Sequence, residues 1–406
     1  MRTPAAWFSW VAIVMMLGAA APASAQEVLK LGEGETLTIS GFINSTLFTD
    51  RQRFGGFGQG QNAEWAAQTE LKTDKTFADG DIRNTRISFD FKGEPVLGSW
   101  APRGVVETDF FGGQDAPPFG DEQPRVRARL AYADLSNGRT TLRIGQYWSP
   151  MFGEVPVSLS HIAFPLGYGS AGMVGWRFPG VYFYRDLVAP GGPASAQLQL
   201  AAFKGSGPAT PGEDTPAAIG NGEASGLPQL EARLNFGRKT EEVRWALYAV
   251  GHVDWKDTSG TGVKGDNLTA LGFEAGGNLA PGRLTLHGNY YYGKALGQQF
   301  AHITQQGNVR GWGAWGQAGY DFTPNWSLWG FFGIDDPDEA QFPEDNPNLP
   351  ALQRQLARQV NREVDGMLRF KAGRYALGLE WFRAMTRWNT GLTNADQVSL
   401  SVLYTL

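Results

Sequence analysis

The last ten residues, QVSLSVLYTL at positions 397–406, alternate apolar and polar side chains up to the end of the chain. Positions 398, 400, 402, 404 and 406 are apolar, and only Leu403 interrupts the polar face. This period of two is that of a strand with one apolar face, and a tilted strand needs roughly 9 to 11 residues to cross a bilayer. We therefore expect a membrane strand here, with Tyr404 and Leu406 as the assembly signal of a β-barrel.

The amino-terminal end has the pattern of an export signal. Arg2 provides a charged start, residues 7–17 are apolar apart from Ser9, and Ala23, Ser24 and Ala25 form a small-residue cleavage site. The apolar run is shorter than the 18 or so residues that a spanning helix requires. We predict a signal peptide over residues 1–25 that is removed after Ala25, a short segment over 26–35, and one barrel domain over 36–406.

Composition excludes several classes of protein. The 40 acidic residues outnumber the 35 basic ones, whereas a nucleic-acid-binding surface is basic. The chain has no cysteine, and its four histidines at positions 161, 252, 287 and 302 have no ligand spacing. We therefore expect no metal, no cofactor and no nucleic-acid partner. A chain with 54 glycines and no helical span must satisfy its backbone between strands if it lies in lipid, which favours a barrel.

Alternating segments of about ten residues recur along the chain, as in outer-membrane barrels. Joins after even-numbered segments are short, such as 136–138 and 372–373, and joins after odd-numbered segments are mostly long, such as 149–172. The pattern predicts an all-β, antiparallel, up-and-down transmembrane barrel of sixteen strands, with eighteen as the alternative. The expected strands are 36–49, 81–93, 102–111, 125–135, 139–148, 173–185, 195–205, 227–236, 242–255, 267–279, 283–294, 309–322, 325–335, 361–371, 374–388 and 395–406.

The lipid-facing side chains follow from the alternation. On the fourth strand we expect the even-numbered residues 126–132 to face lipid, and on the fifth Leu142 and Ile144, joined by a three-residue turn with Gly138 in the left-handed conformation. Aromatic residues near strand ends are expected to form the two interfacial girdles of a membrane barrel. They are Tyr320, Phe322 and Trp326 at the short-turn end and Trp148, Trp255 and Trp388 at the other.

The third long join, residues 149–172, is more apolar than the others and is called the third loop below. A sixteen-stranded barrel is wide enough for an aqueous channel, and an apolar loop prefers contact with protein to bulk water. We therefore expect this loop to fold inward and narrow the channel. Its candidate constriction residues are Phe152, His161, Phe164 and Tyr168.

Residues 125–152, an arginine-rich strand, a tight turn and IGQYWS at 144–149, resemble the general trimeric porins of Gram-negative outer membranes and, more closely, the DcaP-like porins. The resemblance implies an outer-membrane homotrimer whose third loop faces a ladder of basic residues. The matching positions are Arg86, Arg129 and Arg177, with Arg125, Arg127 and Arg143 beside them and Glu154 as the facing acid. The chain departs from the pattern in ending on Leu406 instead of phenylalanine, in lacking an amino-terminal coiled coil, and in having one loop carboxylate.

These features predict a porin, not an enzyme, that is surrounded by outer-membrane lipid and lets small hydrophilic solutes diffuse passively through a water-filled channel. Charge rings set selectivity in such pores, so an arginine-lined constriction would favour anions or carboxylated solutes. An alternative is that the arginines pair with lumen acids such as Asp90, Glu107 and Asp109 and only hold the wall together. Three other functions stay open: a substrate-selective channel with a binding site in the constriction, a plugged structural or adhesive barrel, and a barrel-borne hydrolase.

Overall fold

A computed structural model describes residues 28–55, 64–68, 76–113, 123–160, 165–205, 220–257, 267–297, 308–341 and 358–406. Strands make up almost all of the regular structure in these ranges, with α1 (Asn221–Ala224) and the 3-10 turn η5 (Glu339–Gln341) as short additions. No helix in this part of the chain is both long enough and apolar enough to cross a membrane. His161 and Phe164 lie outside the described residues, as does the predicted signal peptide.

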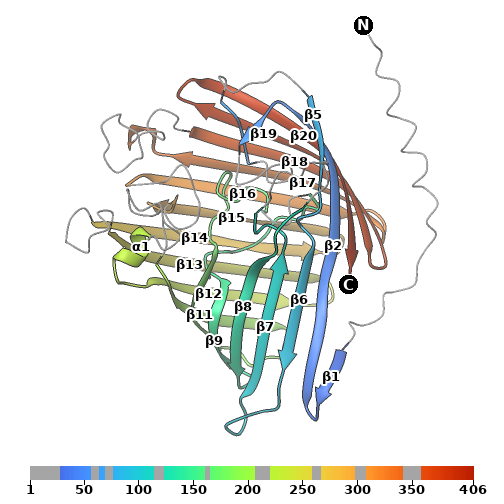
Figure 1. The fold of residues 1–406 in the computed structure, drawn as a ribbon, viewed down its shortest axis with the longest axis vertical. Helices are drawn as coiled ribbons and strands as arrows, with labels where there is room; N and C mark the ends of the chain where they lie inside the picture. The colour runs from blue at the N-terminus through green and yellow to red at the C-terminus, as the bar shows by residue number, and fades with distance from the viewer. Residues whose placement is uncertain are drawn as a thin grey trace.

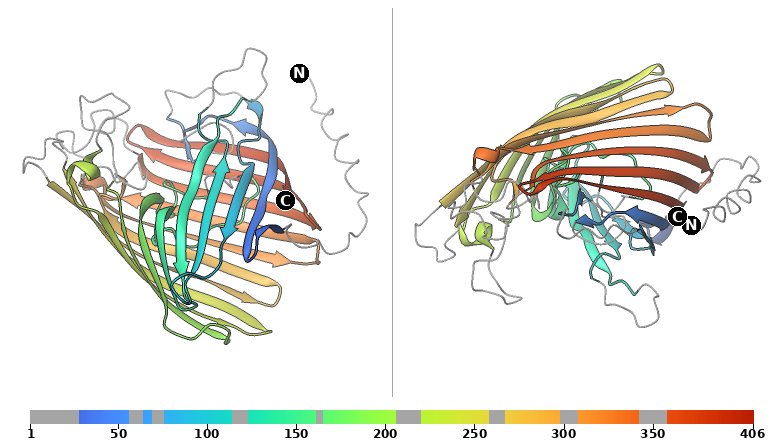
Figure 2. Two further views of the ribbon diagram at one scale, coloured as in Figure 1. Left: turned by 60° about the horizontal axis from the view of Figure 1, so that its bottom comes forward. Right: turned by 90° about the horizontal axis from the view of Figure 1, so that it is seen from above.

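Sixteen antiparallel strands form a closed barrel, as the sequence predicts (Figures 1 and 2). The ring closes where β20 pairs with β2, from Phe42 opposite Thr405 to Arg51 opposite Asp396. The strands of the ring are β2 (Glu35–Arg51), β6 (Arg86–Lys92), β7 (Ala101–Asp109), β8 (Arg127–Ser136), β9 (Thr140–Trp148), β10 (Arg177–Asp186), β11 (Ala194–Phe203), β12 (Gln229–Lys239), β13 (Val243–Asp257), β14 (Asn267–Pro281), β15 (Leu284–Lys294), β16 (Arg310–Asp321), β17 (Trp326–Pro337), β18 (Arg358–Ala372), β19 (Tyr375–Trp388) and β20 (Gly391–Thr405).

Two further segments join the same sheet without adding a position to the ring. β5 (Thr76–Asp81) pairs with the second half of β2, and β6 pairs with the first half, so the two share one place. β1 (Val28–Gly32) pairs with the start of β2 beyond the end of β20. The sixteen-strand prediction is therefore confirmed over its eighteen-strand alternative. β3 (Phe54–Gly55) and β4 (Trp65–Ala66) form a separate two-stranded sheet.

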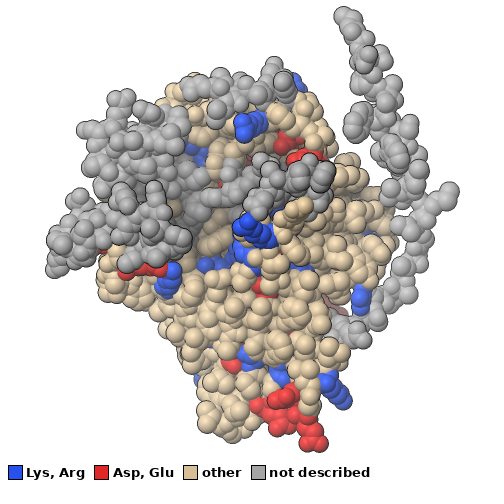
Figure 3. All heavy atoms as spheres, viewed as in Figure 1, with Lys and Arg blue, Asp and Glu red and all other residues tan. Residues whose placement is uncertain are grey.

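The last strand has the two faces that the opening stretch predicts. On β20, Val398 and Leu400 are each 48% exposed on the outer surface, whereas Ser399 and Ser401 are buried inside the barrel. Higher on the outer face, Arg383 pairs with Asp396 at 3.0 Å, and Trp381 donates to Asp396 from its ring nitrogen. In Figure 3 a belt of uncharged surface separates the charged tip at the bottom from charges higher up. The outer face of β20 is thus apolar at Val398, Leu400 and Val402, as expected of a strand that faces lipid.

One face assignment is wrong because of a bulge. Val126 and Ala128 are exposed as expected, but the β7–β8 register shifts between Glu107 and Thr108, and Leu130 is buried. The extra residue reverses the alternation, so Tyr132 packs edge-on against Tyr147 on the inner face and not toward lipid. The turn also holds four residues between the last pair, Ser136 and Thr141, with Gly138 left-handed as expected.

The aromatic girdles are partly corrected. Tyr320, Phe322 and Trp326 are exposed near the β16–β17 turn, as predicted. At the opposite end, Trp388 is buried inside the barrel, where its ring nitrogen donates to the carbonyl of Ala66 at 3.1 Å. Trp148 stacks on Phe152 of the third loop with the ring centroids 3.7 Å apart. These two tryptophans therefore belong to the interior packing.

Leu400→Arg tests the lipid-facing assignment. Because Leu400 lies between Val398 and Val402 on the apolar outer face, an arginine there should lower the free energy of unfolding by about 2–4 kcal/mol. Urea titration of the heat-modifiable folded band in lipid vesicles measures this loss. Leu392→Arg is the matched control, because Leu392 is exposed near the outer end of the same strand and should cost about 0–1 kcal/mol. Equal stability of both variants would contradict the assignment.

Candidate functional site

The first part of the third loop is fixed to the wall at β12. After β9 the chain turns inward, with the Ser149 N–H donating to the carbonyl of Trp176 at 2.8 Å. The Met151 N–H donates to the Glu231 carboxylate at 2.8 Å, and Arg233 donates to the carbonyl of Pro150 at 2.8 Å. Met151 is fully buried. The loop therefore leaves the β9–β10 edge and reaches the inner face of β12.

The middle of the loop crosses to β16 and β19. The Val157 N–H donates to the side-chain oxygen of Gln317 at 2.7 Å, and the Gln317 amide donates back to the Val157 carbonyl at 2.8 Å. The Gln317 amide thus donates to and accepts from the same loop residue, in the way that the backbone of a neighbouring strand would. Further on, the Ser160 hydroxyl and N–H both donate to one oxygen of Glu380, at 2.8 and 3.1 Å.

The end of the loop is held by β18. The Gly167 N–H and the Ser170 hydroxyl donate to the two oxygens of Glu363, at 3.0 and 2.6 Å. At Gly172, with φ of +96°, a Cβ atom would lie 2.3 Å from the backbone of Ala314, so only glycine allows this close approach to β16. These contacts place the described parts of the third loop inside the barrel. Burial raises the pKa of Tyr168 well above its ordinary value, so its phenol is neutral.

Five inward-facing arginines of β6–β9 are paired with carboxylates. Arg129 donates to Glu107 and Asp109, both at 2.8 Å, and Arg127 forms two bonds to Asp109 at 2.7 and 3.0 Å. Arg86 lies 3.8 Å from Glu107. Arg143 makes a bidentate pair with Asp134 at 2.7 and 2.8 Å, and Arg103, which the sequence argument omitted, does so with Asp90 at 2.9 and 2.8 Å.

Arg177 has different surroundings from the other arginines. Its guanidinium lies 4.9 Å from the Trp148 ring and 4.4 Å from the Trp176 ring, and Arg129 lies 5.6 Å from the same Trp148 ring. Arg177 is buried and forms no ion pair with a described residue. Arg125 precedes β8, where its carbonyl accepts a bond from the Gly112 N–H at 2.9 Å. The structure thus gathers the predicted basic positions along one wall, from β6 to β10.

Glu154, the predicted facing acid, is held across the barrel. Asn278 on β14 donates to its carboxylate at 2.7 Å, and His287 Nδ1 on β15 lies 3.7 Å from its other oxygen. In the ring order, β14 and β15 are eight strands from β6 and β7. Burial alone would raise the pKa of Glu154, but His287 and Asn278 outweigh it and hold the pKa below its usual range. The carboxylate is therefore ionised and already has partners.

A second segment that the sequence pattern does not predict also lies inside the barrel. In the join between β2 and β5, called the first loop below, Ala66 of β4 donates from its N–H to Thr386 at 2.8 Å, and Trp65 lies under the Arg358 guanidinium at 4.6 Å. Phe54 of β3 packs against Phe382 with the ring centroids 5.7 Å apart. Both loops thus cover the inner faces of β17–β20, which are nearly fully buried. In the sequence, the feature that could have indicated this inward segment is a tryptophan within a polar join.

The two carboxylates of β7 are both engaged by an arginine. Glu107 and Asp109 both accept bonds from Arg129 and so are wall charges and not a free carboxylate pair. Within the described ranges, no three histidine or acidic side chains are grouped in a way that would hold a metal ion.

The barrel is similar to solved outer-membrane channels. It matches the outer membrane channel DcaP of Acinetobacter baumannii at a TM-score of 0.68 and 18% identity, over 93% of this chain and 99% of that one. OprB of Pseudomonas putida matches at 0.56 and 10%, over 91% and 94%. The trimer form of OmpT of Vibrio cholerae matches at 0.53 and 13%, over 92% and 100%. No sequence family and no curated protein matches the chain. At these identities the comparison shows the fold, which is that of an outer-membrane channel, and confirms the predicted resemblance at that level.

Glu363→Ala tests the attachment of the third loop. Removing this carboxylate leaves the Gly167 N–H and the Ser170 hydroxyl without their acceptor, which should cost about 1–3 kcal/mol of local stability. We expect faster proteolytic cleavage within residues 149–172 of the folded barrel, measured by mass spectrometry of the fragments. Glu242→Ala, an exposed acid at the β12–β13 turn, should cleave like the unmodified protein. Unchanged cleavage of the Glu363→Ala variant would contradict the attachment of the third loop to Glu363.

Proposed function

We propose that this protein is an outer-membrane porin through which small hydrophilic solutes diffuse, with anions or carboxylated solutes favoured at the constriction. The observation that carries this proposal is a closed barrel with an arginine-rich wall on one side and the third loop fixed to the opposite side. A pore narrowed in this way exposes permeating ions to wall charges at short range.

The charge balance of the wall supports an anion preference. Among the described residues, the arginines at positions 86, 103, 127, 129 and 143 form ion pairs with four carboxylates, those of Asp90, Glu107, Asp109 and Asp134. Ion pairing therefore reduces the positive charge of the wall, whereas Arg177 forms no ion pair with a described residue. The anion preference that we propose is therefore modest, and weaker than a ladder of six unpaired arginines would give.

A plugged structural barrel is the second candidate. Its support is that the first and third loops both pack against β17–β20 and occupy that side of the interior. The conductance of the purified protein separates the two candidates, since a plugged barrel would pass no current. We propose no catalytic role, because the Glu107 and Asp109 carboxylates are engaged by arginines.

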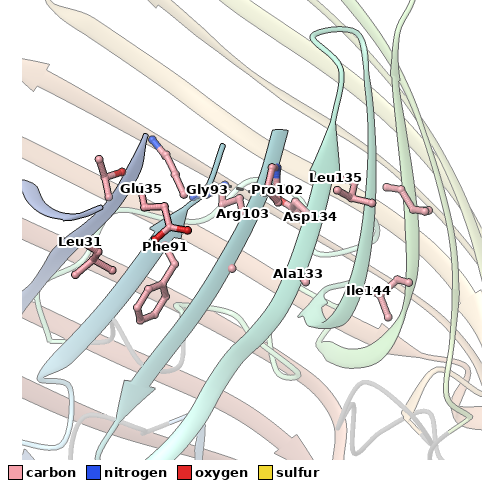
Figure 4. Close-up of a pocket in the computed structure, with 14 residues that line it drawn as sticks. Leu31, Glu35, Phe91, Gly93, Pro102, Arg103, Ala133, Asp134, Leu135 and Ile144 are labelled. Carbon is pink, nitrogen blue, oxygen red and sulfur yellow. Dashed lines mark ion pairs between the residues drawn. The ribbon is translucent and has the colours of Figure 1, made fainter. Parts of the chain in front are cut away.

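We also propose that three copies associate, as in the trimer form of OmpT. The outer wall of β6–β9 carries a groove of about 470 Å³ beside β1 (Figure 4). Phe91, Leu135 and Ile144 flank it, and Gly104 and Ala133 leave its floor low. A second copy is the occupant that this face fits, since its small side chains allow close approach of another barrel.

A reversal potential in a planar bilayer with a salt gradient tests the proposed selectivity. We expect current and an anion preference, and Arg177→Gln should lower the anion-to-cation permeability ratio by about twofold because it removes an unpaired charge near the constriction. Arg139→Gln, an exposed arginine at the β8–β9 turn, should leave the ratio unchanged. A clear cation preference of the unmodified protein would overturn the selectivity, and absence of current would overturn the porin.

A further inference from the structure

A second set of basic side chains lies at the short-turn end of the barrel, below the third loop. A cavity of about 680 Å³ there is lined by the ends of β12, β13 and β18 and by Glu154 and Val157 of the third loop. Its basic residues are Arg238, Lys239, Arg244 and Arg369, of which Arg238 lies on the outward-facing parity of β12. In outer-membrane barrels the short turns face the periplasm, so this cavity is at the inner exit of the proposed channel.

These basic side chains lack the carboxylate partners that the arginines of β6–β9 have. Within the described part of the chain, none of the four forms an ion pair. Arg369 donates to the hydroxyl of Ser327 at 3.1 Å and lies 4.9 Å from the Trp329 ring, both neutral groups. The acids that line the cavity are Glu154, which already has Asn278 and His287 as partners, and Asp321, which attracts the charge of Arg369. The cavity therefore has a positive excess.

Two of the four cations face each other directly. Lys239 on β12 is opposite Arg244 on β13 in the strand register, and the alternation of both strands turns these side chains inward. Like charges directly opposite each other destabilise a sheet, so the pair lowers the stability of the empty barrel. An anion between the two side chains would relieve the repulsion and form charge-assisted hydrogen bonds with both.

We propose that this cavity is an anion-binding site in which Lys239, Arg244 and Arg369 hold the carboxylate or phosphate group of a solute at the inner exit. The inference rests on the proposed porin function and extends it. Pairing with acids reduces the positive charge along β6–β10, whereas Lys239 and Arg244 at the exit form no ion pair with a described residue, so the exit should bind anions more tightly than the constriction does. The channel is then asymmetric, with its stronger anion site on the short-turn side.

Side-specific block of single channels tests the site. Citrate, as a carboxylate probe, and pyrophosphate, as a phosphate probe, are added separately to each side of oriented channels in potassium chloride. We expect at least one probe to reduce the current from the short-turn side at a concentration at least fivefold lower than from the other side. The double variant Lys239→Ala with Arg244→Ala should raise that concentration at least fivefold and abolish the asymmetry.

Arg185→Ala is the matched control. Arg185 is exposed on the outer face of β10 near the same end of the barrel, with Thr140 as its hydrogen-bond partner, and its loss should leave the block unchanged. A heat-modifiable folded band checks that each variant forms a barrel. Equal block from both sides, or a double variant that is blocked like the unmodified protein, would overturn the proposal.

Calorimetric titration of the detergent-purified barrel with the same two probes separates this site from the proposed function. Binding that the double variant loses, in a protein that passes no current, would overturn the porin and support the site. Current with the expected selectivity, but no binding of either probe, would overturn the site and leave the porin standing.

Discussion

The fold depends on the requirement that a chain in hydrocarbon satisfy all of its backbone hydrogen bonds internally. Strands do this only in a ring without edges, and here the ring closes through the pairing of β2 with β20. β5 and β6 together complete the opposite edge of β2, since neither is long enough alone. Closure also fixes the side-chain alternation on every strand, and so decides which charges can meet inside the barrel.

The same requirement governs the third loop. Peptide groups that enter the barrel lose water, and side chains of the wall replace it: Gln317 pairs with Val157, Glu380 with Ser160, and Glu363 with Gly167 and Ser170. Each bond satisfies a buried group that would otherwise be costly. The position of the loop is therefore set by acceptors on β12, β16, β18 and β19 as much as by its own apolar residues. Ion selectivity and the position of the third loop should therefore be coupled, because side chains of the wall provide both the charges that ions meet and the partners that hold the loop.

The sixteen strands could be predicted from the sequence because alternation and join length are local signals, and most strand ends agree within a few residues. The face of Tyr132 could not, since a bulge adds one residue without any mark in the pattern. The partners of the third loop were also hidden. Glu363 holds a loop residue 196 positions away, and along β18 it is only one of several alternating charges. The prediction for Trp388 was wrong for the same reason. Its position near a strand end predicts a girdle residue, whereas its hydrogen bond to Ala66 joins residues that are 322 positions apart.

Counting arginines therefore overstates the field in such a lumen. A basic residue with a carboxylate within 3 Å contributes a dipole more than a charge, and its effect on a passing ion falls quickly with distance. Arg127, Arg129 and Arg143 are of this kind, whereas Lys239 and Arg244 are not. The sequence alone does not distinguish the paired group from the unpaired group, because the acids that neutralise the paired group lie on neighbouring strands. The position of the unpaired charge should therefore determine where an anion binds along the pore. The place where basic residues are most frequent should not.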